Sequence, residues 1–318
     1  MDSKEQYPKY LTYEHRHNLP PSVLTQEYPL PTLGEKEIYY PVNKILLPHF
    51  SSEKELQLFG ASQFCSFLSD TIEVEHGLVI PAIAELRRIP FKIPDEPKQD
   101  LFKTATDEGF HAEQSLAFLT QLENHFGVHT FSESLPPLFI RRLKQQRSLL
   151  TNPVHKQLIT ILNGVVTETR ISHELGMFAK NEELSDSIRR ICLTHAQDEV
   201  IHSSQFQALG HWLWDDFNEE TKELSSSFFI NSTIARSLPD IDNIIISFSN
   251  ATGRAMEDAT KLVLKAYNED LLIDLMTHDI NHTLKYLHKL GVENYLSIDM
   301  AIEKEREKLH LEFEKRRK

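Results

Sequence analysis

The chain has 318 residues, and 40% of them are hydrophobic, which is enough to bury a sizeable core and excludes bulk disorder. It contains only 10 glycines and 15 prolines, which favours helices over a turn-rich β fold. Its formal net charge of −13 is unsuited to gripping nucleic-acid phosphates or anionic lipids. Neither a nucleic acid nor a membrane is therefore an expected partner.

Helical periodicity begins after an N-terminal arm, 1–50, which is rich in Pro, Tyr and His and is expected to be extended with short helical turns. The pattern then predicts helices at about 53–89, 96–126, 134–149, 153–180, 184–215, 221–238, 240–275, 277–290 and 295–316. The clearest helix start is Asn152, a good N-cap residue, followed by Pro153. We interpret 1–318 as one all-α domain with core helices in 53–215 and appended helices in 220–318.

The sequence also predicts a cytoplasmic location. The two cysteines, Cys65 and Cys192, lie in helical patterns and form neither a disulfide framework nor a CxxC site. No apolar stretch reaches the roughly 18 residues that a membrane span needs. The N-terminus lacks the apolar region of a signal peptide.

Two of the predicted helices carry the same pattern, D-E-x-x-H. The copies are Asp107-Glu108-Gly-Phe-His111 and Asp198-Glu199-Val-Ile-His202. Because positions three or four apart share a face of an α-helix, the Glu and the His of each copy project together. His195 lies on the second of these faces, one turn before Glu199. The neighbours on both faces are apolar or small, so these side chains are predicted to point into the core.

Two further helices each place a single acid in an apolar stripe. Glu168 shares a face with Val165 and Leu175, and Glu75 lies in a similar stripe on the first helix. Glu73 is a competitor, because the segment from Glu73 onward also reads E-x-x-H. It falls about 160° from Glu75 on the helical wheel, opposite the apolar stripe. We therefore predict that Glu75 is the inward acid.

Four inward carboxylates and three inward imidazoles predict a dinuclear metal centre. Buried, unpaired carboxylates are costly or stay protonated, whereas two divalent cations balance four negative charges. One Glu from each of two helices plus Glu-x-x-His from each of two others is the plan of ferritin-like di-iron and di-manganese proteins. Two iron ions are the expected cofactor, and manganese is an alternative. The predicted ligands are Glu75, Glu108, His111, Glu168, His195, Glu199 and His202.

Other polar residues have weaker patterns. Asp107 and Asp198 could each accept the second N–H of a ligand imidazole, or could be solvated or capping acids. His278 and His282 form an HxxxH pair that suggests zinc, but with no third ligand in view we interpret them as helix-surface residues. The segment 14–17 also imitates E-x-x-H, but no helical stripe surrounds it and we assign it no role.

The ligand pattern resembles the di-iron aminoarene N-oxygenase family, typified by p-aminobenzoate N-oxygenase. The mark of that family is a third His one turn before the last Glu-x-x-His, which is His195 here. The order of the motifs is similar, and Pro81, six residues after Glu75, matches as well. The interval between Glu75 and Glu108 is slightly shorter than in the family. The resemblance covers about 55–291.

This resemblance implies a ferritin-like four-helix bundle that activates O₂ as a peroxide and N-oxygenates an amine. The product would be a hydroxylamine, nitroso or nitro compound, formed in secondary metabolism. His195 would be the additional catalytic ligand. Electrons would come from an external donor, since no flavin or nicotinamide fingerprint is present. A homodimer is expected by analogy.

The resemblance has one departure, which concerns the substrate. Where the family is expected to hold an aminobenzoate carboxylate with Arg, this chain has His278, a candidate substrate-binding residue that lacks the guanidinium fork. A small-molecule or carrier-protein-tethered amine is therefore expected in place of a simple aminobenzoate. The alternatives are another di-iron oxidase (a C–H hydroxylase, desaturase or amino-acid-cleaving oxygenase) and a non-catalytic iron-binding helical protein.

Overall fold

The computed structural model describes residue 30, residues 45–128 and residues 135–317. Within these ranges the regular structure is helical and contains no β-strand, so the predicted all-α fold is confirmed. The predicted N-terminal arm and the E-x-x-H pattern at 14–17 lie outside the described residues, apart from Leu30 and the last residues of the arm. A short 3₁₀ helix, Leu47–His49, precedes the first long helix.

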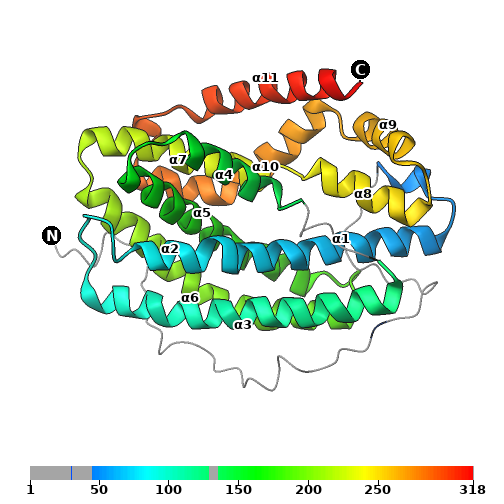
Figure 1. Ribbon diagram of the computed structural model, residues 1–318, viewed down its shortest axis with the longest axis horizontal. Coiled ribbons are helices and arrows are strands. Elements are labelled where there is room, and N and C mark those ends of the chain that lie inside the picture. Colours follow the sequence, from blue (N-terminus) through cyan, green and yellow to red (C-terminus); the bar gives the residue numbers. More distant parts are fainter. Residues whose placement is uncertain (1–29, 31–44, 129–134, 318) are drawn as a thin grey trace.

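Four long helical segments form the core (Figure 1). They are α1 (Glu53–Val74) continued by α2 (Ile80–Glu85), α3 (Asp95–Phe126), α5 (Pro153–Lys180) and α6 (Asp186–Asp216). The α1 and α3 helices pack side by side and run antiparallel, α5 packs along α6, and α2 also contacts α5. Fully buried side chains such as Leu101, Leu158 and Phe206 fill the space between them. This arrangement is compatible with a ferritin-like bundle.

Local sequence signals set the helix starts. The Ser52 hydroxyl caps α1 by accepting a hydrogen bond from the Glu55 backbone N–H at 3.2 Å. The Asn152 side chain caps α5 by accepting from Val154 N–H at 2.9 Å, and Pro153 occupies the first turn. The predicted start of α5 is therefore confirmed.

The helix predicted at 53–89 is interrupted at its functional acid. A π-helical turn, Glu75–Val79, separates α1 from α2, and the Ile80 backbone N–H donates to the Glu75 carbonyl. Pro81 lies just beyond this turn and has no N–H to continue the α-helical hydrogen-bond pattern. A wider turn before the proline accommodates its ring, and such turns often mark functional sites. The helix also ends at Glu85, before the predicted residue 89.

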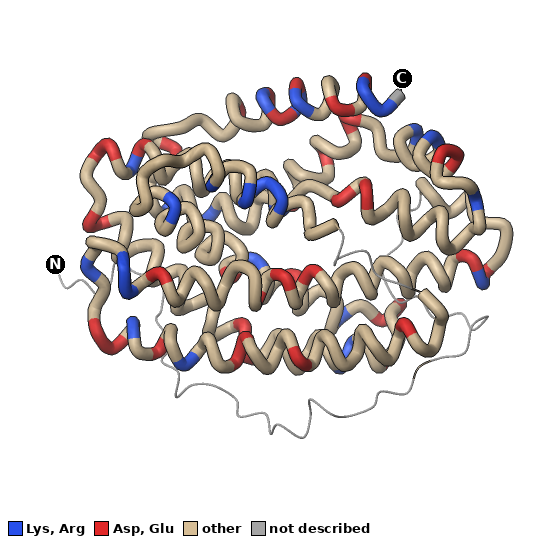
Figure 2. The backbone as a smooth tube through the Cα atoms, in the orientation of Figure 1, with Lys and Arg blue, Asp and Glu red and all other residues tan. Residues whose placement is uncertain are grey.

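The remaining helices cover one side of the core (Figure 1). They are α4 (Leu138–Leu149), α7 (Glu219–Ser237), α8 (Ile241–Thr252), α9 (Met256–Ala266), α10 (Glu269–Leu290) and α11 (Ile298–Arg317). Charged residues of both signs follow one another along α11, the outermost of them (Figure 2). In the part of the chain that the structure describes, no helix combines the length and the apolarity that crossing a bilayer requires.

Other predicted helix boundaries were also wrong, and the following have a local reason. The segment predicted as one helix at 240–275 contains α8, α9 and the first residues of α10, and its first break comes where Gly253 adopts a left-handed φ of 66° that ends α8. The helix predicted to start at 277 starts at Glu269, where the Asn268 side chain caps the Leu271 backbone N–H at 2.9 Å. The helix predicted from 134 starts at Leu138, after Pro137.

A close approach between α6 and α10 depends on Gly210. The buried Tyr286 hydroxyl donates a hydrogen bond to the Gln207 carbonyl at 3.0 Å, and a Cβ atom on Gly210 would overlap this hydroxyl. A Cβ there would also lie 3.1 Å from Val165. Gly210 therefore sets how closely the appended α10 can pack against the core.

Gly210→Ala should reduce the free energy of unfolding by about 1–3 kcal/mol, because the added methyl overpacks a buried contact. Gly176→Ala is the matched control, since nothing lies within 4 Å of that position in α5. The control should be neutral or up to about 1 kcal/mol more stable, owing to the higher helix propensity of Ala. Urea unfolding measures both changes. Equal effects of the two substitutions would contradict the Tyr286 contact.

Candidate metal centre

The four core helices bring all seven predicted ligand side chains together in the interior. Each of these residues is at most 4% exposed. Their potential ligand atoms fall into three groups, and within each group the atoms lie within 4.8 Å of one another. The groups are Glu75, His111, His195 and Glu199; Glu108, His111, Glu199 and His202; and Glu75, Glu108 and Glu168. A cluster of this composition is positioned to hold a metal ion.

The groups overlap, because His111 and Glu199 belong to both four-residue groups. The His111 Nδ1 atom lies 3.0 Å from Glu108 Oε2 and 3.2 Å from Glu199 Oε1. His202 Nδ1 lies 2.9 Å from Glu108 Oε1 and 3.4 Å from the same Glu199 oxygen. The Glu108 carboxylate therefore lies between two imidazoles that come from different helices.

His195 joins the cluster from the turn before Glu199. Its Nε2 atom lies 3.0 Å from Glu199 Oε1 and 3.8 Å from Glu75 Oε1. Its ring centroid is 3.9 Å from that of His111. The His195 imidazole therefore lies beside Glu75 and Glu199. It is on the same side of the cluster as His111.

Each D-E-x-x-H copy contributes an aspartate to the histidine of the other copy. His111 Nε2 lies 3.5 Å from Asp198 Oδ2, and His202 Nε2 lies 3.4 Å from Asp107 Oδ2. Both aspartates are buried. An aspartate behind each imidazole favours the tautomer whose Nδ1 faces the carboxylate cluster with a free lone pair. The sequence suggested this role for the aspartates but did not reveal that the pairing crosses between helices.

The buried carboxylates are better explained by a bound cation than by a core without one. Neither oxygen of Glu75 or Glu168 has a hydrogen-bond partner, although all four atoms are buried. Such groups are rare in folded proteins, because burial without a partner costs the full desolvation penalty. The donor set is carboxylate oxygen and imidazole nitrogen, which suits iron or manganese. These residues therefore fit the divalent metal that their pattern predicts.

The electrostatics separate the four glutamates into two kinds. Burial raises the pKa of Glu75 and of Glu168 well above the usual value, and the charges of the neighbouring glutamates raise each further. Burial is also the largest single influence on Glu108, but the charge of His202 and the hydrogen bonds with His111 and His202 together outweigh it and hold the pKa at about 2. Glu199 has a lowered pKa for a similar reason, with three imidazoles around it. Without a cation, two of the four carboxyls therefore tend to hold protons.

The structure buries Glu75 within the cluster and leaves Glu73 partly exposed outside it. His278 and His282 lie on the exposed side of α10, and no group of three potential metal ligands among the described residues includes either. The His282 ring stacks on His173 with centroids 4.8 Å apart. His278 instead lines a separate cavity, whose other residues the sequence had not singled out.

No protein-family model matches the chain, and none of the curated proteins matches it significantly. The geometry of the cluster is therefore the main guide to function.

Glu168→Gln should stabilise the metal-free protein at pH 8. A carboxyl whose pKa is raised on folding favours the folded state at low pH, and this contribution is lost as the pH rises toward the raised pKa. Between the usual Glu pKa and the raised pKa, the free energy of unfolding of the parent should therefore fall by about 1.4 kcal/mol per pH unit relative to that of the variant. Urea unfolding in chelator at pH 5 and pH 8 measures the difference.

The stabilisation by Glu168→Gln should shrink toward pH 5, and added Fe(II) should reverse the order of stability, because the parent alone keeps the full ligand set. A parent that is more stable than the variant at pH 8 in chelator would contradict the repulsion between these carboxylates.

Proposed function

We propose that the protein is a non-haem di-iron oxygenase that N-oxygenates an amine. The observation that carries the proposal is the cluster of four carboxylates and three imidazoles at the centre of the core helices. Two overlapping four-residue groups that share His111 and Glu199 support two neighbouring metal positions. The two D-E-x-x-H copies and two lone glutamates match the ligand plan of ferritin-like dinuclear proteins.

The residues of the chain have distinct roles in this proposal. Two ferrous ions held by the cluster supply the redox chemistry that activates O₂. The buried apolar faces of the core helices exclude bulk water from the centre. Asp107 and Asp198 hold the His202 and His111 rings in the orientation that presents Nδ1 to the metal positions.

The balanced reaction converts an amine, O₂, two electrons and two protons into a hydroxylamine and water. The chain carries no nucleotide fingerprint, so the electrons come from an external two-electron donor. Repetition of the reaction gives nitroso and nitro products. We place the reaction in the cytoplasm, in secondary metabolism, with a homodimer as the working assembly.

His195 distinguishes N-oxygenation from the other di-iron oxidations. Four acids and two imidazoles complete the ordinary ligand plan, and His195 adds a third neutral nitrogen beside Glu75 and Glu199. Burial lowers the pKa of this imidazole, which keeps its nitrogen lone pair free to bind a metal. A C–H hydroxylase or desaturase with the ordinary plan has no use for this residue.

Glu168→Ala and His202→Ala should each lower the iron content from about two ions per chain to well below one, because each removes a buried ligand. Glu73→Ala is the matched control, since Glu73 lies two residues from Glu75 but outside the cluster. Elemental analysis after anaerobic loading with Fe(II) measures the content. Full retention of iron by both ligand variants would refute the metal centre.

His195→Ala should keep more than half of the iron but lose N-oxygenation. The test incubates the iron-loaded protein with O₂, a chemical reductant and a panel of amines, and mass spectrometry detects oxygen added to nitrogen. A parent that adds oxygen only to carbon would instead indicate a C–H hydroxylase. A His195→Ala variant as active as the parent would contradict the role of the third imidazole.

A further inference from the structure

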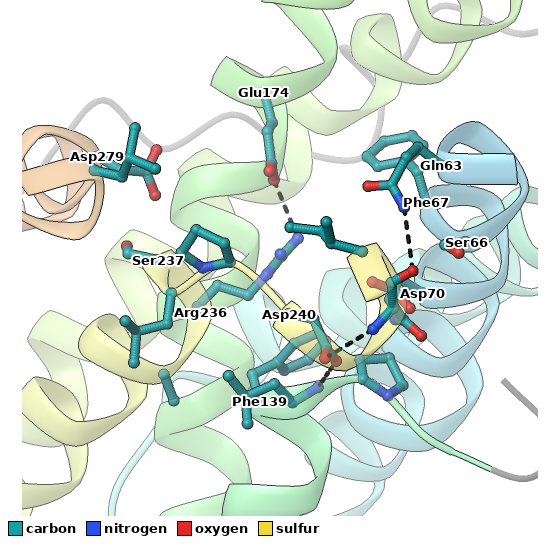
Figure 3. Close-up of a pocket in the computed structure, with 18 of the residues that line it drawn as sticks. Gln63, Ser66, Phe67, Asp70, Phe139, Glu174, Arg236, Ser237, Asp240 and Asp279 are labelled. Carbon is teal, nitrogen blue, oxygen red and sulfur yellow. Dashed lines mark hydrogen bonds and ion pairs between the residues drawn. The ribbon is translucent and has the colours of Figure 1, made fainter. Parts of the chain in front are cut away.

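A cavity of about 520 Å³ opens beside the core, between α1, α5, α10 and the connection from α7 to α8 (Figure 3). Its apolar wall includes the rings of Phe59, Phe67 and Phe139. Its polar wall holds four carboxylates and two guanidinium groups. These are Asp70, Glu174, Asp240, Asp279, Arg170 and Arg236. The cavity thus combines an aromatic lining with an excess of negative charge, which favours an organic cation.

Both arginines of the cavity already have carboxylate partners. The Glu174 carboxylate accepts from Arg170 at 3.3 Å and from Arg236 at 3.1 Å, and the second of these contacts is drawn in Figure 3. Arg170 also forms an ion pair with Asp279. A substrate carboxylate entering the cavity would compete with these internal partners.

Asp240 is also engaged by the protein. Its carboxylate accepts from the Leu138 backbone N–H at 2.9 Å and forms an ion pair with Arg141 at 3.2 Å. These contacts join the start of α4 to the start of α8, which gives Asp240 a structural role. Three of the four lining acids are therefore neutralised by groups of the protein itself.

Asp70 is the exception. It is partly buried, it lines the cavity from α1, and no residue in the described ranges forms a hydrogen bond or an ion pair with it. Burial raises the pKa of its carboxyl well above the usual value and Asp240 raises it further, although the charge of Arg236 acts in the opposite direction. An unpaired carboxylate here lowers stability unless a cation from outside the chain neutralises it.

The cavity lies close to the metal centre along α1. Thr71 lines it, and Thr71 precedes Glu75 by four residues, which is about one helical turn or 6 Å along the axis. Asp70 itself lies about 140° from Glu75 on the helical wheel, so a substrate held at Asp70 would extend past Thr71 to reach the centre. The reacting nitrogen needs a neutral lone pair, so a cation held at Asp70 is a different nitrogen of the same molecule.

We propose that this cavity binds the substrate, and that the substrate is a diamine whose protonated nitrogen pairs with Asp70 while its second, neutral nitrogen is oxygenated. The inference rests on the proposed function, which it extends by naming the substrate class. An aromatic diamine suits the lining, because the phenylalanine rings contact an aryl group while the carboxylate holds the ammonium group. A simple aminobenzoate, with its anionic end, is the wrong charge type for this cavity.

Two probes with the same aryl amine test the charge preference. In 4-aminobenzylamine the benzylic nitrogen is protonated at pH 7, and in 4-aminobenzoate a carboxylate takes its place. Calorimetric titration of the iron-loaded, full-length protein without O₂ should give at least tenfold tighter binding of 4-aminobenzylamine. Equal affinities, tighter binding of 4-aminobenzoate or no binding of either probe would overturn the assignment.

Asp70→Asn and Glu73→Gln form a matched pair on one helix. Asp70→Asn removes the unpaired carboxylate, and Glu73→Gln removes a neighbouring carboxylate that does not line the cavity. Asp70→Asn should weaken binding of 4-aminobenzylamine at least tenfold and should raise the melting temperature of the ligand-free protein. Glu73→Gln should bind as the parent does. Unchanged binding by Asp70→Asn would overturn the proposal.

Product analysis separates failure of the cavity from failure of the oxygenase. If 4-aminobenzylamine binds through Asp70 but gains no oxygen, the cavity assignment stands and the proposed function fails. If the parent N-oxygenates 4-aminobenzoate as efficiently as 4-aminobenzylamine, the oxygenase stands and the cavity assignment fails.

Discussion

Four carboxylates are buried in one small volume at the centre of the core helices, and the stability of these helices depends on how those charges are neutralised. Glu75 and Glu168 have no hydrogen-bond partner, and burial raises the pKa of each, with a further rise from the charges of Glu108 and Glu199. Hydrophobic packing alone does not compensate for such a group. The four core helices hold these side chains together, and bound cations would remove the repulsion. Relief of the repulsion that destabilises the metal-free core would thus contribute to the free energy of metal binding.

The helices supply this cluster by two different means. The D-E-x-x-H copies use the ordinary α-helical spacing, and the exchange of aspartates between them ties α3 to α6 at the centre. Glu75 instead lies at the start of a π-helical turn, which Pro81 explains because its ring cannot follow a regular α-helical turn. The cavity around Asp70 lies along the same helix, one turn before Glu75. A break in one helix therefore lies next to both the metal ligands and the proposed substrate site.

The sequence predicted the features that depend on local spacing. Apolar periodicity was sufficient to predict the all-α fold, the start of α5 and the inward faces of the seven cluster residues, including the choice of Glu75 over Glu73. Features that depend on tertiary packing or on a single dihedral angle were not predicted. The left-handed φ of Gly253 ends α8 within a helix that was predicted to be continuous. The Asn268 cap starts α10 at residue 269, eight residues before the predicted start at 277. The sequence did not identify Asp70 as a candidate binding residue, because only the folded chain shows which acids have hydrogen-bond or ion-pair partners.

Anomalous X-ray diffraction at the iron absorption edge, from crystals grown anaerobically with Fe(II), would show whether the core binds two iron ions. We expect two anomalous peaks inside the core, one beside His111 and one beside His202, with the carboxylates of Glu108 and Glu199 near both. A core without an anomalous peak, or iron bound only at surface histidines such as His278 and His282, would contradict it.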